Sequence, residues 1–64
     1  MREWLKQARE SHGLSQYKVA ELAKMSQSYY AAIETGDRGG KLPVETARKI
    51  AEVLKFEWTR FYED

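Results

Sequence analysis

The chain has 64 residues, of which 42% are hydrophobic and 33% charged, with a formal net charge of +1 and no cysteine. These values exclude a disulfide framework, a cysteine-based metal site and a disordered chain, and they fit a reducing, intracellular setting. A chain of this length buries only about 60% of its unfolded surface, so we expect one small domain, residues 1–64, with a stability of roughly a few kcal/mol.

The charges are distributed with a weak asymmetry. Residues 1–42 carry seven Lys or Arg and five Asp or Glu (+2), and residues 43–64 carry four and five (−1). This asymmetry neither requires nor excludes a nucleic-acid partner. No apolar run approaches the ~18 residues of a membrane span, and the N-terminus does not resemble a signal peptide, so no membrane partner is expected.

The first half of the chain predicts three helices separated by short breaks. The first covers about residues 2–11 and carries Trp4, Leu5 and Ala8 at helical spacing. Ser15 is a good N-cap for the second helix. Its apolar residues are Val19, Ala20, Leu22 and Ala23. After a tight break at Lys24-Met25, Ser26 caps the third helix, which ends near Thr35 with Gly36 as a left-handed residue.

The second half predicts two more helices after a polar loop at residues 37–41. Pro43 suits the first position of the fourth helix. The apolar residues of this helix are Val44, Ala47, Ile50, Ala51 and Leu54. A short fifth helix over about residues 57–63 carries Trp58, Phe61 and Tyr62. No segment alternates like a strand, so the prediction is a compact all-α, five-helix domain.

The third helix has one face suited to a core and one that is small and neutral. Tyr30 and Ile33 point the same way and can be buried. Gln27, Ser28, Ala31, Ala32 and Thr35 lie on the other side. Such a face can approach a DNA major groove closely, where glutamine suits adenine and alanine meets a thymine methyl group. The alternative is a surface helix that happens to be polar.

Several short stretches keep a fixed order along the chain: Leu14-Ser15-Gln16, Ala20, Ser26-Gln27-Ser28, Ile33-Glu34, Gly36 and PVETARKIAEVL. From about Trp4 onwards this order resembles the phage repressor and Cro class of DNA-binding domains, often called Xre-like. The resemblance implies a lambda-repressor-like fold in which the second and third helices form a helix-turn-helix. The second helix would lie across the DNA backbone and the third would enter the major groove.

By this resemblance, the residues that contact base edges are Gln27, Ser28 and Ala32. The residues that match backbone contacts are Gln16, Ser26, Thr35, Arg38 and Lys41. Gln16 would also brace Gln27. The alternatives are a plain first-turn residue for Gln16, a cap only for Ser26, and solvated loop charges for Arg38 and Lys41. Tyr29, on the flank of the helix, either packs on sugar and phosphate or covers the core.

The resemblance also implies a structural ion pair between Arg9 and Glu34. The chain departs from the family at two glycine positions, which are occupied by Lys24 and Lys55, and in its longer loop. Tyr30 replaces an aliphatic residue, and we expect it in the core with its hydroxyl at the rim.

The last nine residues hold more aromatic side chains than so small a core easily buries. Related repressors bind inverted-repeat operators as symmetric dimers. Phe56 and Trp58 are therefore candidates for a homodimer interface, and core packing is the alternative.

Catalysis is not expected, because no carboxylate pair, activated nucleophile or phosphate-binding loop can be assembled around the single histidine, His12. No cofactor, metal or small-molecule ligand is expected. The function predicted is that of a small cytoplasmic regulator, bacterial or phage-encoded and of repressor type, that binds double-stranded DNA and has no effector domain. The alternative is a protein-interaction adaptor or antitoxin-like module with the same fold.

Overall fold

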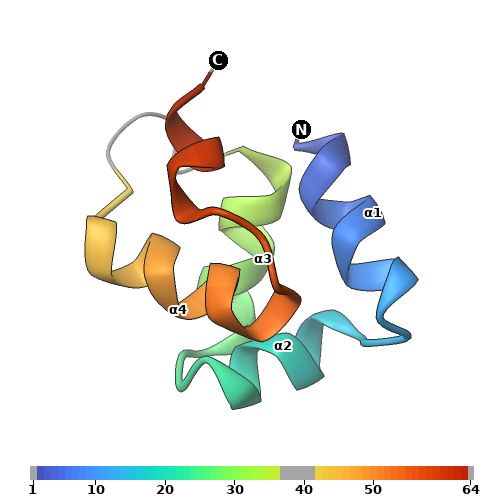
Figure 1. Ribbon diagram of the computed structural model, residues 1–64. Helices are drawn as coiled ribbons and strands as arrows, with labels where there is room; N and C mark the ends of the chain where they lie inside the picture. The colour runs from blue at the N-terminus through green and yellow to red at the C-terminus, as the bar shows by residue number, and fades with distance from the viewer. Residues whose placement is uncertain (1, 37–41, 64) are drawn as a thin grey trace.

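The structure is a computed structural model that describes residues 2–36 and 42–63. It has four α-helices and one 3-10 helix (Figure 1): α1 (Glu3–Ser11), α2 (Gln16–Leu22), α3 (Gln27–Thr35), α4 (Val44–Leu54) and η2 (Trp58–Tyr62). The described residues contain no strand, which agrees with the all-α prediction.

The predicted count of five helices is not confirmed, because the last element is a 3-10 helix rather than an α-helix. The amide of Arg60 donates to the carbonyl of Glu57 over 3.0 Å, which is the i to i+3 spacing of a 3-10 helix. Such helices occur in short pieces, and η2 has only five residues. Pro43 is also displaced by one position, since it is the N-cap of α4 and not its first residue.

The ends of α2 and α3 follow from local chemistry. The hydroxyl of Ser15 accepts a hydrogen bond from the amide of Lys18 over 3.0 Å, and the hydroxyl of Ser26 accepts one from the amide of Tyr29 over 3.1 Å. Each serine thus satisfies an amide that has no partner within its helix. Gly36 ends α3 with φ of 93°, a left-handed conformation that glycine adopts without a Cβ clash.

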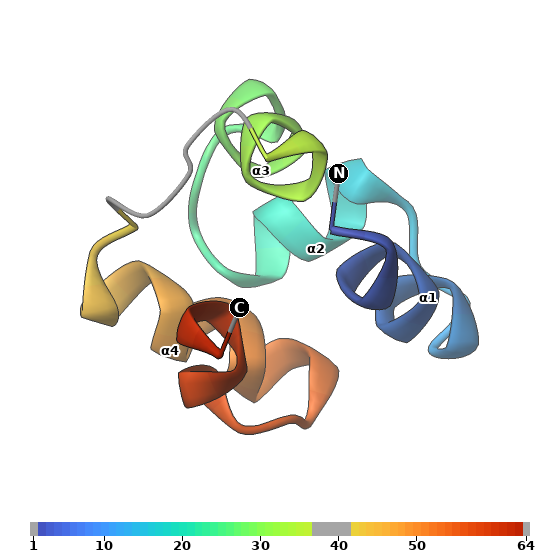
Figure 2. The same cartoon turned by 90° about the horizontal axis from the view of Figure 1, so that it is seen from above.

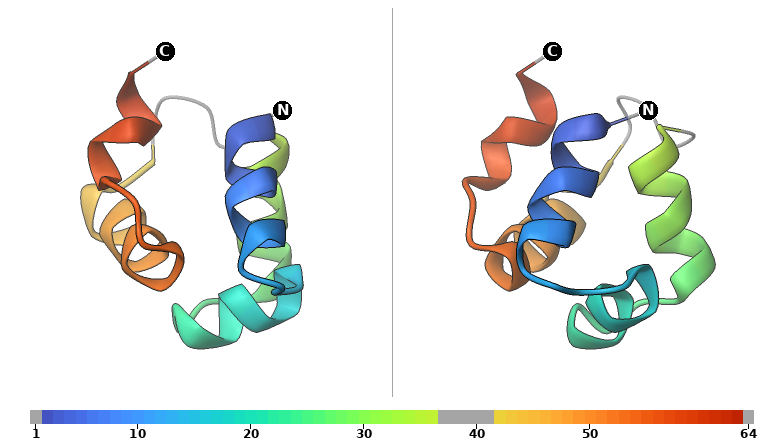
Figure 3. Two further views of the ribbon diagram at one scale, coloured as in Figure 1. Left: turned by 45° about the vertical axis from the view of Figure 1, so that its right-hand side comes forward. Right: turned by 90° about the vertical axis from the view of Figure 1, so that its right-hand side faces the viewer.

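The helices surround one core, and the domain as a whole measures 25 × 20 × 20 Å. In Figure 3, α1 and α3 lie side by side, α2 crosses one end of this pair, and α4 with η2 forms the opposite side. The buried side chains come from every element. The buried hydrophobic residues are Leu5, Val19, Ala20, Ala23, Tyr30, Ile33, Leu42, Ala47, Ile50, Ala51, Leu54 and Phe61, and Glu34 is buried with them. Leu22, Val44 and Tyr62, which were expected on apolar faces, are exposed instead.

Aromatic side chains close the core between α1 and the C-terminus. The ring centroid of Trp4 lies 5.1 Å from that of Phe56 and 5.2 Å from that of Phe61, and both pairs are edge-to-face. The guanidinium of Arg60 lies 4.7 Å from the centroid of the Trp4 ring, a distance typical of a cation–π contact. Phe56 therefore packs partly within its own chain.

Polar contacts fix the ends of distant elements to one another. The hydroxyl of Tyr62 donates to the carbonyl of Leu42 over 2.6 Å, which fastens η2 to the segment before α4. Nε2 of His12 lies 2.8 Å from the carbonyl oxygen of Leu54 and donates to it, because a carbonyl only accepts.

None of the helices described is long and apolar enough to cross a membrane.

Candidate functional site

The helices α2 and α3 and the turn between them form the unit that carries the candidate site. The amide of Met25 donates to the carbonyl of Ala20 over 2.9 Å, and that of Lys24 donates to the carbonyl of Glu21 over 3.1 Å. Figure 2 shows α3 above one side of α2, and the two helices pack directly on each other. The turn thus sets the angle between them.

The turn contains a residue in a strained conformation. Lys24 has φ of 61°, in the left-handed region that glycine adopts freely. Lys55, at the end of α4, also has φ of 61°. Both positions are those where lysine replaces the glycine of the resembling family, so the turn keeps its left-handed backbone in spite of the lysine.

The face of α3 turned away from the core is polar and small. Gln27, Ser28 and Thr35 are exposed, and Ala31 and Ala32 are half-buried. The buried residues of the helix are Tyr30, Ile33 and Glu34. No lysine or arginine occurs between Gln27 and Thr35. This face can meet a surface closely and can offer amide and hydroxyl groups to it.

The hydroxyl groups on this face differ in whether their hydrogen is still free to donate a hydrogen bond. Ser26 accepts from the amide of Tyr29, so its own hydrogen remains available to a phosphate oxygen. Thr35 donates its hydrogen to the carbonyl of Ala32 over 3.1 Å and would have to rotate before it donated elsewhere. Ser26 is therefore the better placed of these two predicted backbone contacts.

Beneath this face, α1, α2 and α3 meet at the carboxylate of Glu34, whose side chain is only 1% exposed. Nε and Nη2 of Arg9 donate to Oε2 and Oε1 of Glu34 over 2.8 and 3.2 Å, a bidentate ion pair. The hydroxyl of Tyr30 donates to Oε2 over 2.8 Å, and Nε2 of Gln16 donates to Oε1 over 2.9 Å. Each carboxylate oxygen thus accepts two hydrogen bonds.

These contacts shift the acidity of the three ionisable groups. Burial by itself would raise the pKa of Glu34, but the hydrogen bonds from Arg9, Gln16 and Tyr30 outweigh it and lower the pKa. The hydrogen bond to Glu34 raises the pKa of Arg9, against the effect of burial. Burial, followed by the hydrogen bond to Glu34, raises the pKa of Tyr30. Near neutral pH the site therefore holds a carboxylate, a guanidinium and a neutral phenol.

The position of the Tyr30 hydroxyl differs from the one predicted from the sequence. We expected it at the rim of the core, but Tyr30 is fully buried and its partner lies one helical turn further along α3. The i, i+4 spacing of tyrosine and glutamate was the signal that could have indicated this contact.

Gln16 uses its amide nitrogen on Glu34 and not on Gln27. A carboxylate can only accept, so Gln16 must turn its NH2 group inward, and its carbonyl oxygen and second N–H remain for other partners. Gln16 and Gln27 each open a helix directly after a capping serine. The two glutamines therefore occupy equivalent starting positions on α2 and α3.

The other predicted site residues lie at the edges of this unit or beyond it. Tyr29 is half-buried and packs against the core on the flank of α3. Arg38 and Lys41 lie outside the described residues. Phe56 and Trp58 are half-buried at the C-terminal side. Among the residues that the structure describes, no group of three or more His, Asp or Glu side chains is arranged to hold a metal ion.

Comparisons with known proteins agree with this geometry. A helix-turn-helix family model matches residues 5–61. A curated relative, the uncharacterized HTH-type transcriptional regulator YqaF of Bacillus subtilis, is 45% identical over 64 residues, which cover 100% of this chain and 82% of the relative. No solved structure matches this chain significantly. The matches are to a helix-turn-helix family and to an HTH-type transcriptional regulator, in agreement with the expectation of a non-catalytic protein.

Proposed function

The chain belongs to the helix-turn-helix family, and from this premise we propose that it is a transcriptional regulator that binds double-stranded DNA sequence-specifically through α2 and α3. The observation that carries the proposal is the exposed, small and neutral face of α3, held at a fixed angle to α2 by the capped turn. A major groove admits one α-helix and is read by amide, hydroxyl and methyl groups.

In the proposed complex, α3 enters the major groove and α2 lies across the backbone. Gln27, Ser28 and Ala32 would contact base edges. The backbone contacts would be Gln16, Ser26, Tyr29, Thr35, Arg38 and Lys41. Removal of either loop cation should lower affinity evenly across sequences and reduce the slope of log affinity against log salt by about 0.9.

The protein would act in the cytoplasm of a bacterial cell as a repressor of the phage or mobile-element type. This part of the proposal rests on the resemblance of the chain to phage repressors and on the regulator that it matches. Reporter expression from a promoter that overlaps the selected operator would test the direction of regulation. Repression requires that expression falls when the protein is supplied.

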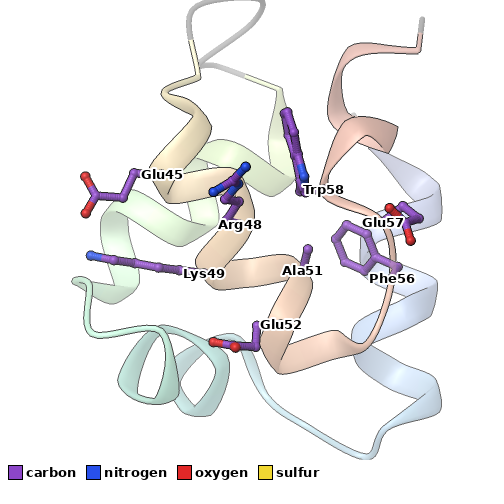
Figure 4. Close-up of a pocket in the computed structure, with 8 residues that line it drawn as sticks. All are labelled: Glu45, Arg48, Lys49, Ala51, Glu52, Phe56, Glu57 and Trp58. Atoms are coloured by element: carbon purple, nitrogen blue, oxygen red, sulfur yellow. The ribbon is translucent and has the colours of Figure 1, made fainter.

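We further propose that two copies bind an inverted-repeat operator as a homodimer. An open groove of about 530 Å³ runs beside α4 (Figure 4). It is lined by Glu45, Arg48, Lys49, Ala51, Glu52, Phe56, Glu57 and Trp58. The guanidinium of Arg48 lies 5.1 Å from the centroid of the Trp58 ring, and arginine and tryptophan are frequent in the centres of protein interfaces. Trp58 supports this role better than Phe56, which packs on Trp4.

Selection from a pool of random duplexes tests both parts of the proposal. Enrichment of an inverted repeat, with half-sites about one helical turn apart, is the expected result for a dimer. A single enriched half-site would overturn the dimer and keep DNA reading. No enrichment at near-physiological salt would overturn sequence-specific binding and favour the adaptor alternative. Sedimentation with and without the selected duplex gives the stoichiometry directly.

A further inference from the structure

Packing within the fold does not explain why a tyrosine occupies position 17. It is the second residue of α2, directly after Gln16, and it is 61% exposed. It is also the most exposed of the large hydrophobic side chains that the structure describes. Tyrosine combines an apolar ring with a hydroxyl donor, so an exposed tyrosine beside a binding surface is a candidate contact.

Helical geometry shows on which flank of α2 this side chain lies. The buried residues of the α2 stripe are Val19, Ala20 and Ala23, which follows the helix directly. With about 100° between successive residues, Tyr17 and Leu22 lie at opposite edges of this stripe, each about 110° from its centre. One flank of α2 therefore carries Tyr17 and the other carries Leu22.

Contacts with neighbouring helices identify the two flanks. Leu22 lines a small groove together with Lys49, Glu52 and Val53, so its flank faces α4. Gln16 reaches Glu34 of α3 from near the centre of the buried stripe, about 100° from Tyr17. In the view from above, α2 lies between α3 and α4 (Figure 2). The Tyr17 flank is therefore the one turned away from α4, at the N-terminal turn of α2, where Gln16 contacts α3.

We propose that Tyr17 is an additional DNA-backbone contact, whose hydroxyl donates a hydrogen bond to a phosphate oxygen while its ring covers the adjacent deoxyribose. This inference rests on the proposed function, in which the N-terminal turn of α2 crosses the backbone. Tyrosine hydroxyls are among the groups that bind phosphate oxygens in protein–DNA complexes. Because the group is neutral, its contact releases no counterion and leaves the salt dependence unchanged.

The test compares Tyr17→Phe with wild type by fluorescence anisotropy over a range of salt concentrations. The probes are the duplex recovered by the selection and a scrambled duplex of the same length. Tyr17→Phe removes only the donor, and we expect affinity to fall by about three- to ten-fold with an unchanged salt slope. The fall should be similar on both duplexes, because a phosphate contact carries no sequence information.

Leu22→Ala is the matched control, since it truncates an exposed side chain on the other flank of the same helix. It should bind DNA as wild type does. Equal affinities of Tyr17→Phe and wild type would overturn the contact while leaving the proposed function intact. An equal loss in Leu22→Ala would also overturn it, because the effect would then arise from the fold of α2. A wild type that binds neither duplex would instead overturn the proposed function itself.

Discussion

Tyr30 donates its hydroxyl hydrogen to Oε2 of Glu34, one turn further along α3, over 2.8 Å in the interior of the domain. The contact allows a phenol to occupy a position where the resembling family has an aliphatic side chain. It also supplies one of the four hydrogen bonds that satisfy the Glu34 carboxylate. The inner face of α3 is therefore fixed by a polar network as well as by apolar packing.

Tyr30→Phe should destabilise the protein by roughly 1.5–3 kcal/mol, because it removes a hydrogen bond to a charged group that stays buried. Urea unfolding measures the change. Tyr17→Phe is the control, since the exposed Tyr17 should change stability by less than about 0.5 kcal/mol. Equal unfolding free energies for these two variants would contradict the role assigned to the Tyr30 hydroxyl.

The pKa of Glu34 is lower in the folded protein than its ordinary value. The unfolded chain therefore binds the proton more tightly, and the stabilisation by Glu34 is present at neutral pH. It should be lost as the pH falls below about 4.3 and through the folded pKa. The unfolding free energy of wild type minus that of Glu34→Gln should shrink over this range. A difference that stays constant with pH would contradict the prediction, because the other carboxyl groups are common to both proteins.

Arg9→Ala should destabilise the protein by roughly 3–5 kcal/mol, since it leaves a carboxylate that is 1% exposed without its charged partner. This is comparable to the whole stability expected of so small a domain. A double-mutant cycle with Glu34→Ala is best measured in the presence of a stabilising osmolyte. We expect a coupling energy of about 1–3 kcal/mol. A coupling near zero would show that the two side chains act independently.

Lys24→Gly and Lys55→Gly should each stabilise the protein by about 0.5–1 kcal/mol. Both lysines have φ of 61°. In this conformation the steric cost of a Cβ atom exceeds the entropic cost that glycine adds by making the unfolded chain more flexible. Lys49→Gly is the matched control within α4 and should destabilise by a similar amount. Thermal unfolding of the three variants checks the signs, and destabilisation by all three would contradict the backbone strain.

Gln27→Ala should relax the base preference at one position of the selected operator, with a loss of about 1–3 kcal/mol of discrimination there. Preferences elsewhere should remain. Gln7→Ala, a change of the same kind at an exposed position of α1, should leave the selected sequence unaltered. If both variants select the operator of wild type, Gln27 does not read a base.

Much of the candidate site could be predicted from residues close together in sequence. Ser15 and Ser26 cap their helices by accepting from amides three residues further on, and Gly36 ends α3 through its own backbone conformation. The positive φ angles at Lys24 and Lys55 follow in the same way from the positions that glycine holds in the resembling family. The functional expectation came from the order of these local features.

The partners of Glu34 could not be predicted completely. The resemblance named Arg9, but the contacts from Gln16 and Tyr30 depend on where α2 and α3 meet. The last element was predicted as an α-helix, and its 3-10 form accompanies its contact with the segment before α4. The exposure of Leu22 was missed because the spacing of apolar residues does not show how much of the surface of α2 the neighbouring helices cover.

The sequence by itself determined the four α-helices, the serine caps of α2 and α3 and the small neutral face of α3, because hydrogen bonds and backbone conformations within a few residues decide them. Only the tertiary structure decided which donors reach the buried carboxylate, which aromatic rings close the core and which flank of α2 faces α4. These depend on packing between segments distant in the chain, where the position and angle of whole helices set the distances between side chains.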